Sequence, residues 1–150
     1  MPSTDRPADK PTELPHRIAH AAYELHASLE RDLHKTAVEL DLTDALADAI
    51  WQLDPALGPL SRRELAARLH CDPSNVTFLV DRLERRRLVT RSRARADRRV
   101  KALALTSAGR SARRRLIATV ARSPMFSALT VTQRQQLAEL LGRCVSSERE

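Results

Sequence analysis

The segment "RARADRRV" concentrates charge, because it holds Arg93, Arg95, Asp97, Arg98 and Arg99 within eight positions. Asp97 and Arg99 are two positions apart, so an extended chain places both side chains on the same face. A carboxylate beside an arginine can hold the guanidinium in a bidentate pair and fix its direction. The segment is therefore suited to a negatively charged partner such as phosphate, with a solvated charge cluster as the alternative.

A second group of candidate residues lies in the preceding segment, "DPSNVTFLVDRLER". Asparagine can pair with adenine through two hydrogen bonds, and serine or threonine can reach a base or a phosphate. An arginine on the same helical face is suited to a phosphate. The candidates for nucleic-acid contact are Ser74, Asn75, Thr77, Phe78 and Arg82.

Two of these candidates have alternative interpretations. Phe78 can pack on the methyl group of a thymine, or it can fold into the core beneath the arginine-rich segment. Arg82 can clamp a phosphate, or it can form an ion pair with an acid such as Asp81 or Glu84.

Ser61 and Arg62 are further candidates because they begin a helix. The N-terminus of a helix presents free N–H groups, which can bind a phosphate. Ser61 also precedes Glu64 by three residues, so it can instead cap the helix as part of a capping box.

The sequence gives little support for other chemistry. It has three glycines and no set of nucleophile, base and orienting group, so we expect no enzyme and no cofactor. His16 and His20 share a helical face, but no carboxylate or thiolate cluster completes a site, so we expect no metal. Cys71 and Cys144 exclude a disulfide framework and leave redox sensing as an alternative to packing.

Charge and composition favour double-stranded nucleic acid as a partner. The net charge is +7, but residues 1–60 carry −6, residues 61–101 carry +8 and residues 102–150 carry +5. Positive charge confined to one region is typical of phosphate binding, whereas 3% aromatic residues disfavour stacking on single strands. No apolar run approaches the ~20 residues of a membrane span. We therefore expect a cytoplasmic protein without a membrane partner.

The hydrophobic pattern predicts the elements that position these residues. Residues 1–13 are polar and rich in proline, which is typical of a disordered arm. Apolar residues at steps of three and four then predict an amphipathic helix over about residues 15–40, whose apolar stripe needs a partner. Four capping signals predict further helices, which are capped by Thr43, by Ser61, by Asp72 and by Thr106 or Ser107. An apolar repeat predicts a last helix over about residues 132–145.

The middle of the chain combines two short helices with two strands. A helix-turn-helix is indicated by two short helices joined by a tight turn, within "LSRRELAARLH" and "CDPSNVTFLVDRLERRRLV". The segments "LVTRSR" and "VKALAL" favour strands that pair as a hairpin with the arginine-rich segment at its tip. The predicted fold class is therefore mainly α with a small β-hairpin.

The stretch "PLSRRELAARLHCDPSNVTFLVDRLERRRLVTRSRARADRRVKALALTSAGR" closely resembles the MarR (multiple antibiotic resistance regulator) family of bacterial transcription factors. The matching features are "ELAARL", "VTFLVDRLE", the wing motif "DRR" and "LTSAGR" at the start of the next helix. The resemblance implies one domain over residues 14–150. Within it, a winged helix-turn-helix (43–106) is flanked by dimerisation helices (14–42 and 107–150).

The resemblance also implies that two copies bind DNA together. In this family the first and last helices of two chains interleave, which would give the apolar stripe its partner. In the wing, the resemblance implies that Arg99, directed by Asp97, enters the minor groove. Arg93, Arg95 and Arg98 would add phosphate contacts. The implied dimerisation residues are Leu14, Ile18, Leu25, Leu116, Val120, Leu137, Leu140 and Leu141.

Four positions depart from the family pattern. His70 and Arg87 stand where the family usually has glycine, so a positive φ is expected at both. Phe78 stands where the family commonly has a polar or basic residue, and the usual glutamine after Thr43 is absent. Family ligands lodge between the dimer helices and the winged domain, where Trp51 or Tyr23 would line a pocket instead of packing in the core.

We therefore predict a DNA-binding transcriptional regulator, a repressor that binds a pseudo-palindromic operator as a homodimer and is released by a small-molecule effector. The effector and its site stay undefined by the sequence. One alternative is a thiol-based redox sensor of the same fold. The other is a dimerisation module that has lost DNA binding.

Overall fold

The computed structural model describes residues 13–93 and 101–147. These residues form six α-helices and a three-stranded antiparallel sheet, which confirms the predicted fold class. The elements are α1 (Glu13–Glu39), α2 (Asp44–Gln52), β1 (Leu60–Ser61), α3 (Arg62–Arg68), α4 (Pro73–Arg85), β2 (Val89–Arg93), β3 (Lys101–Leu105), α5 (Ser107–Ala121) and α6 (Val131–Ser147). Short 3-10 turns, Pro55–Leu57 and Pro124–Phe126, connect α2 to β1 and α5 to α6.

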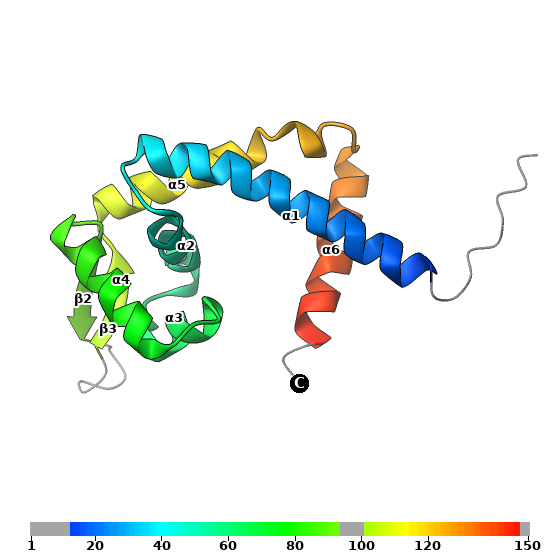
Figure 1. The fold of residues 1–150 in the computed structure, drawn as a ribbon. Coiled ribbons are helices and arrows are strands. Elements are labelled where there is room, and N and C mark those ends of the chain that lie inside the picture. Colours follow the sequence, from blue (N-terminus) through cyan, green and yellow to red (C-terminus); the bar gives the residue numbers. More distant parts are fainter. Residues whose placement is uncertain (1–12, 94–100, 148–150) are drawn as a thin grey trace, which may run out of the picture.

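The elements divide between a winged lobe, made of α2, α3, α4 and the sheet, and the longer helices α1, α5 and α6 (Figure 1). Helices α1 and α5 run side by side, joined by a 2.7 Å hydrogen bond between the hydroxyls of Thr36 and Thr119. Helix α1 then continues beyond the lobe, and α6 stands near its far end (Figure 1). No helix in residues 13–93 or 101–147 is long and apolar enough to cross a membrane.

The core of the lobe is aliphatic. The helical spacing of Val76, Leu79, Val80 and Leu83 on α4 predicts that all four are core residues. Val76, Val80 and Leu83 are fully buried with residues of α2, α3 and the sheet, whereas Leu79 is half-buried against the same core. Leu116 of α5 belongs to the same core and is 1% exposed. Our prediction that Leu116 contacts a second chain is therefore wrong, because its side chain is enclosed by its own chain.

The sheet has the strand order β1-β3-β2. The predicted hairpin strands are confirmed, with Val89 opposite Leu105 and Arg93 opposite Lys101. The additional strand β1, in which Leu60 pairs with Leu103, was not predicted. A strand of two residues is too short to show a periodic pattern, and it is defined only by its pairing with β3.

The predicted caps fix the ends of the lobe helices. Thr43 and Thr106 accept hydrogen bonds from backbone N–H groups of α2 and α5. Ser61 and Glu64 form the predicted capping box, in which Ser61 N–H donates to Glu64 Oε2 at 2.7 Å. The hydrogen bonds from Ser61 lower the pKa of Glu64. Asp72 takes the capping position of α4 without a side-chain hydrogen bond, and α4 starts at Pro73.

Two departures from the family pattern occupy helix ends with left-handed backbone. As expected, His70 and Arg87 have positive φ, 48° and 57°. In each case the next residue donates a backbone hydrogen bond to the carbonyl five positions back, which is the pattern of a Schellman end. A non-glycine residue in this conformation costs about 1–2 kcal/mol, which the two closed helix ends offset.

Helices α1 and α2 meet through charged side chains. His34 Nδ1 lies 2.9 Å from Asp44 Oδ1, which joins α1 to the first turn of α2. One turn further along α2, partial burial raises the pKa of Asp48, and the nearby carboxylates of Asp44 and Glu30 raise it further. His26 lowers the pKa of Asp48, but less than these effects raise it.

Replacing Asp48 with asparagine is expected to stabilise the protein at pH 7. Because the folded state raises the pKa of Asp48, ionisation of this group destabilises the fold as the pH rises through that pKa. The gain should be under about 1 kcal/mol, since the side chain is well exposed and screened. Thermal unfolding at pH 7 and pH 4 checks this, and the gain should shrink at the lower pH.

The matched control for Asp48→Asn is Asp44→Asn, which removes one charge from the same helix. Asp44 pairs with His34 and lies near the positive end of the α2 dipole. This variant should lose stability instead. Equal effects of the two substitutions would contradict the assignment.

Candidate nucleic-acid interface

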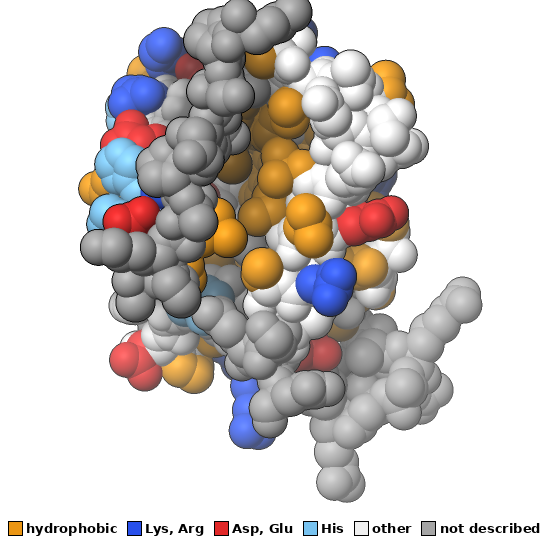
Figure 2. Space-filling model, turned by 90° about the vertical axis from the view of Figure 1, so that its right-hand side faces the viewer, with side chains coloured by type: hydrophobic (Ala, Val, Ile, Leu, Met, Phe, Trp, Pro, Cys, Tyr) orange, Lys and Arg blue, Asp and Glu red, His pale blue; other side chains and the backbone are white. Residues whose placement is uncertain are grey.

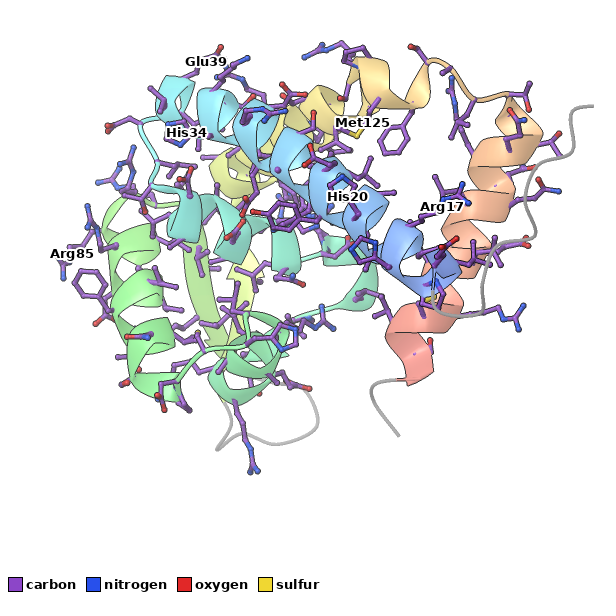
Figure 3. All side chains as sticks on the ribbon, turned by 45° about the vertical axis from the view of Figure 1, so that its right-hand side comes forward. Arg17, His20, His34, Glu39, Arg85 and Met125 are labelled. Carbon is purple, nitrogen blue, oxygen red and sulfur yellow. The ribbon has the colours of Figure 1, made fainter. Side chains whose placement is uncertain are left out.

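Helices α3 and α4 form a helix-turn-helix whose second helix exposes one polar face. Val76, Val80 and Leu83 point into the core, which leaves the opposite side of α4 to solvent. Figure 3 shows Arg85 projecting outward from α4, at the opposite end of the molecule from Arg17. The predicted residues Ser74, Asn75, Phe78 and Arg82 are exposed on α4 together with Arg85.

Phe78 does not enter the core. Its side chain is 59% exposed, so the alternative that it folds under the wing is wrong. The guanidinium carbon of Arg82 lies 5.6 Å from the centre of the Phe78 ring, within the range of a cation–π contact. Arg82, predicted to clamp a phosphate, and Phe78, predicted to contact a thymine methyl group, thus lie against each other one helical turn apart.

One alternative paired Arg82 with Asp81 or Glu84, and the structure does not show that ion pair. Both acids instead bind Arg91 of β2, with Glu84 Oε2 at 2.8 Å from Arg91 Nη2. This cluster, Arg91–Asp81–Glu84, ties the base of the wing to α4. Sequence reasoning missed Arg91, although two acids three positions apart on one helix are a signal for a partner across the packing interface.

Thr77 and Arg62 are brought together by the packing of α3 against α4. The Thr77 hydroxyl donates to the Pro73 carbonyl at 3.1 Å and accepts a 3.4 Å hydrogen bond from Arg62 Nη1. Thr77 is half-buried, whereas Arg62 is exposed. Ser61 is half-buried as well, and its hydroxyl caps α3 by accepting from Glu64 N–H at 3.2 Å.

The tip of the wing lies outside the described residues. This concerns four predicted contacts, Arg95, Asp97, Arg98 and Arg99. The strands on either side of them, β2 and β3, end in the paired residues Arg93 and Lys101. The hairpin thus projects from the same lobe that presents α4 (Figure 1).

A separate apolar surface lies at the other end of the molecule. Hydrophobic side chains gather in a hollow on the face that Figure 2 shows. Among the predicted dimerisation residues, Leu14, Ile18, Leu140 and Leu141 are 43–60% exposed. Three others of this set are half-buried, namely Leu25, Val120 and Leu137. This surface, formed by α1 and α6 with the end of α5, is distinct from the polar face of α4.

The remaining candidates show no assembled site. His16 and His20 are exposed on α1, and residues 13–93 and 101–147 contain no group of three ligands that could hold a metal. Cys71 is half-buried against the core and Cys144 is exposed, both as thiols. Trp51 packs partly buried against the core, as its core interpretation requires, whereas Tyr23 is 69% exposed on α1.

A helix-turn-helix with an exposed polar second helix, followed by a hairpin from the same lobe, defines a winged helix-turn-helix protein, a DNA-binding class. The MarR family model matches residues 55–101, which include α3, α4 and both hairpin strands. The comparison with curated proteins found no match.

Solved structures of the same fold cover nearly the whole chain. The repressor CouR, bound to a 23-mer DNA duplex, is 26% identical with a TM-score of 0.66, over 91% of this chain and 97% of its own. YusO from Bacillus subtilis is 25% identical with a TM-score of 0.59, over 91% and 98%. A MarR-family regulator from Silicibacter pomeroyi is 23% identical with a TM-score of 0.72, over 87% and 88%.

Residues 55–101 therefore resemble the MarR family, and the chain as a whole shares the fold of solved transcriptional regulators of that family. This confirms the resemblance found in the sequence.

Proposed function

We propose that the protein is a homodimeric repressor that binds a pseudo-palindromic operator. The observation that carries the proposal is the exposed face of α4, which combines base-reading side chains (Asn75, Ser74, Phe78) with arginines (Arg82, Arg85). Such a face suits the major groove, where asparagine and serine find base-edge partners and arginines find phosphates. CouR, which shares the fold, is a repressor bound to a DNA duplex.

The apolar surface of α1 and α6 supports the homodimer. An exposed stripe that includes Ile18, Leu140 and Leu141 suits burial against a second copy of the same surface. The family resemblance assigns that role to these helices, within a single domain over residues 14–150. Two α4 helices would then reach successive major grooves about 34–36 Å apart.

Release by a small molecule fits the groove between α1 and α2. This groove has a volume of about 440 Å³, and its lining includes Glu30, Leu33, His34, Asp44 and Asp48. It joins the proposed dimer helices to the winged lobe. A ligand that binds one spacing of the two α4 helices better than another would change DNA affinity by that difference.

The arginine contacts predict how binding depends on salt. Each phosphate contact adds about one unit to the slope of log affinity against log salt. Arg82→Ala should therefore weaken binding to a duplex selected from a random library and lower the slope by about two, because a homodimer carries the substitution twice. Arg99→Ala, whose side chain is assigned to the minor groove, should weaken binding to the same duplex. Fluorescence anisotropy with the selected duplex at four salt concentrations measures both quantities.

The control for this experiment is Arg114→Ala, which removes one positive charge from an exposed position on α5, away from the groove between α1 and α2. Its slope should equal that of the unmodified protein. If no duplex is enriched by the selection, the alternative of a dimerisation module without DNA binding replaces the proposal. An unchanged affinity for Arg99→Ala would remove the wing assignment alone.

A further inference from the structure

Phe78 is the one large hydrophobic side chain that α4 exposes, and its position on the helix is central. Ser74 lies one turn before it and Arg82 one turn after it, on the same exposed face. A ring that is 59% exposed gains little from burial within its own chain. The ring is therefore available to a partner that meets the middle of α4.

Arg82 restricts where the ring can point. Its guanidinium carbon lies 5.6 Å from the ring centre, so the planar group covers one face of Phe78. With this contact in place, Phe78 is still 59% exposed. Asp81, the acid next to Arg82 in sequence, is bound to Arg91 and does not draw the guanidinium away.

The major groove offers one apolar group on its base edges, the 5-methyl group of a pyrimidine. The neighbours of Phe78 on the exposed face, Ser74, Asn75 and Arg82, are polar or charged and match base edges and phosphates. An apolar ring at the centre of such a face matches a methyl group. The other large hydrophobic residues of α4 are less exposed, because Val76, Val80 and Leu83 are buried and Leu79 is half-buried.

We propose that Phe78 determines sequence specificity by packing against the 5-methyl group of a thymine in each half-site, with Arg82 as the residue that positions the ring. The inference rests on the proposed function, since it requires α4 to enter the major groove. It makes this chain a reader of a methyl group at a position where its family commonly has a polar or basic residue.

The test replaces each thymine of the selected duplex, one at a time and in both half-sites, with deoxyuridine, which lacks only the methyl group. Burying one methyl-sized group contributes about 0.8 kcal/mol, which corresponds to about a fourfold change in affinity. One thymine in each half-site should be sensitive to this replacement. For each half-site in which that thymine becomes deoxyuridine, the unmodified protein should bind about fourfold more weakly than it binds the thymine duplex. Phe78→Ala should bind the two duplexes equally.

Arg82→Lys separates a positioning role from a purely electrostatic one. Lysine keeps the positive charge, so the salt slope should stay the same. It lacks the planar group that covers the ring. The ratio of thymine to deoxyuridine affinity should therefore fall toward one, whereas an unchanged ratio would overturn the positioning role of Arg82.

The methyl group can belong to thymine or to 5-methylcytosine, and a second set of duplexes distinguishes them. In these duplexes single cytosines are replaced by 5-methylcytosine. Thymine recognition is supported if only the deoxyuridine series changes affinity, and an effect confined to the 5-methylcytosine series would overturn it. Circular dichroism should show that Phe78→Ala is folded, because the side chain is largely exposed.

The outcomes separate the inference from the proposed function. If the protein selects a duplex but no deoxyuridine changes its affinity, the Phe78 inference is overturned and the DNA-binding function stands. If Phe78→Ala keeps the fourfold discrimination, another residue reads the methyl group and the inference is also overturned. If no duplex is selected, the proposed function itself fails, and the inference fails with it.

Discussion

Replacing Gly109 with alanine is expected to destabilise the winged lobe by about 3 kcal/mol or more, the upper end of the range for overpacked cores. An added Cβ would lie 2.0 Å from the Leu88 carbonyl oxygen and 3.0 Å from its carbon. Both are backbone atoms just before β2, so no side-chain rotation can make room. Urea unfolding followed by circular dichroism measures the loss.

The same contact explains why this position controls the wing. The Thr106 hydroxyl donates to the Arg87 carbonyl at 2.6 Å, and Thr106 N–H donates to the Leu88 carbonyl at 3.0 Å. The start of α5 is thus held against the start of β2. Moving α5 outward to accept the methyl group would break these hydrogen bonds, and therefore Gly109→Ala should weaken DNA binding as well.

Gly142→Ala is the matched control for Gly109→Ala. Gly142 lies in α6, and a Cβ at that position would meet no heavy atom within 4 Å. Alanine is the better helix former by about 1 kcal/mol, so this variant should be as stable as the unmodified protein or more so. A Gly109→Ala protein with unchanged stability would show that α5 and β2 do not pack as described.

The helices of this fold could be predicted because their signals are local. Thr43, the Ser61–Glu64 pair and Thr106 each mark a helix start through contacts within three residues, and the structure bears out all three caps. Left-handed backbone at His70 and Arg87 could be expected only through the glycine pattern of the family. The residue types histidine and arginine do not by themselves indicate a positive φ.

The contacts between elements could not be predicted in the same way. Periodicity shows that Leu116 lies on an apolar face, but it does not show whether the same chain or a second copy covers that face. The 2.0 Å approach at Gly109 and the short strand β1 likewise depend on elements distant in sequence. The helical pattern placed Phe78 near Ser74 and Arg82, and only the packing of the lobe shows that the ring is exposed.

The Arg91–Asp81–Glu84 cluster is the second feature for which we expect a large effect. Arg91 of β2 binds two carboxylates of α4, and its Nε is buried without a hydrogen-bond partner among the described residues. Removing the guanidinium would leave two acids three positions apart on one helix, where like charges repel. Arg91→Met should therefore lower the free energy of unfolding by about 1–2 kcal/mol, a value reduced for partial solvent screening.

The same substitution should impair DNA binding beyond its effect on stability. Arg91 fixes the direction of β2 relative to α4, and thus the direction in which the wing leaves the lobe. If the wing and α4 can no longer enter the minor and major grooves at the same time, the wing should lose its arginine contact in the minor groove. We estimate about a tenfold weaker affinity, corresponding to about 1.4 kcal/mol, measured at a temperature where the variant is fully folded.

Two further variants make the Arg91 prediction specific. Arg86→Met removes an arginine that pairs with Asp41, whose side chain is 94% exposed, so it should change stability by less than about 1 kcal/mol. Adding Asp81→Asn and Glu84→Gln to Arg91→Met removes the repelling charges and should recover part of the stability but not the affinity, since the wing stays untied. If Arg91→Met is no more harmful than Arg86→Met in either measurement, the cluster does not hold the wing to α4.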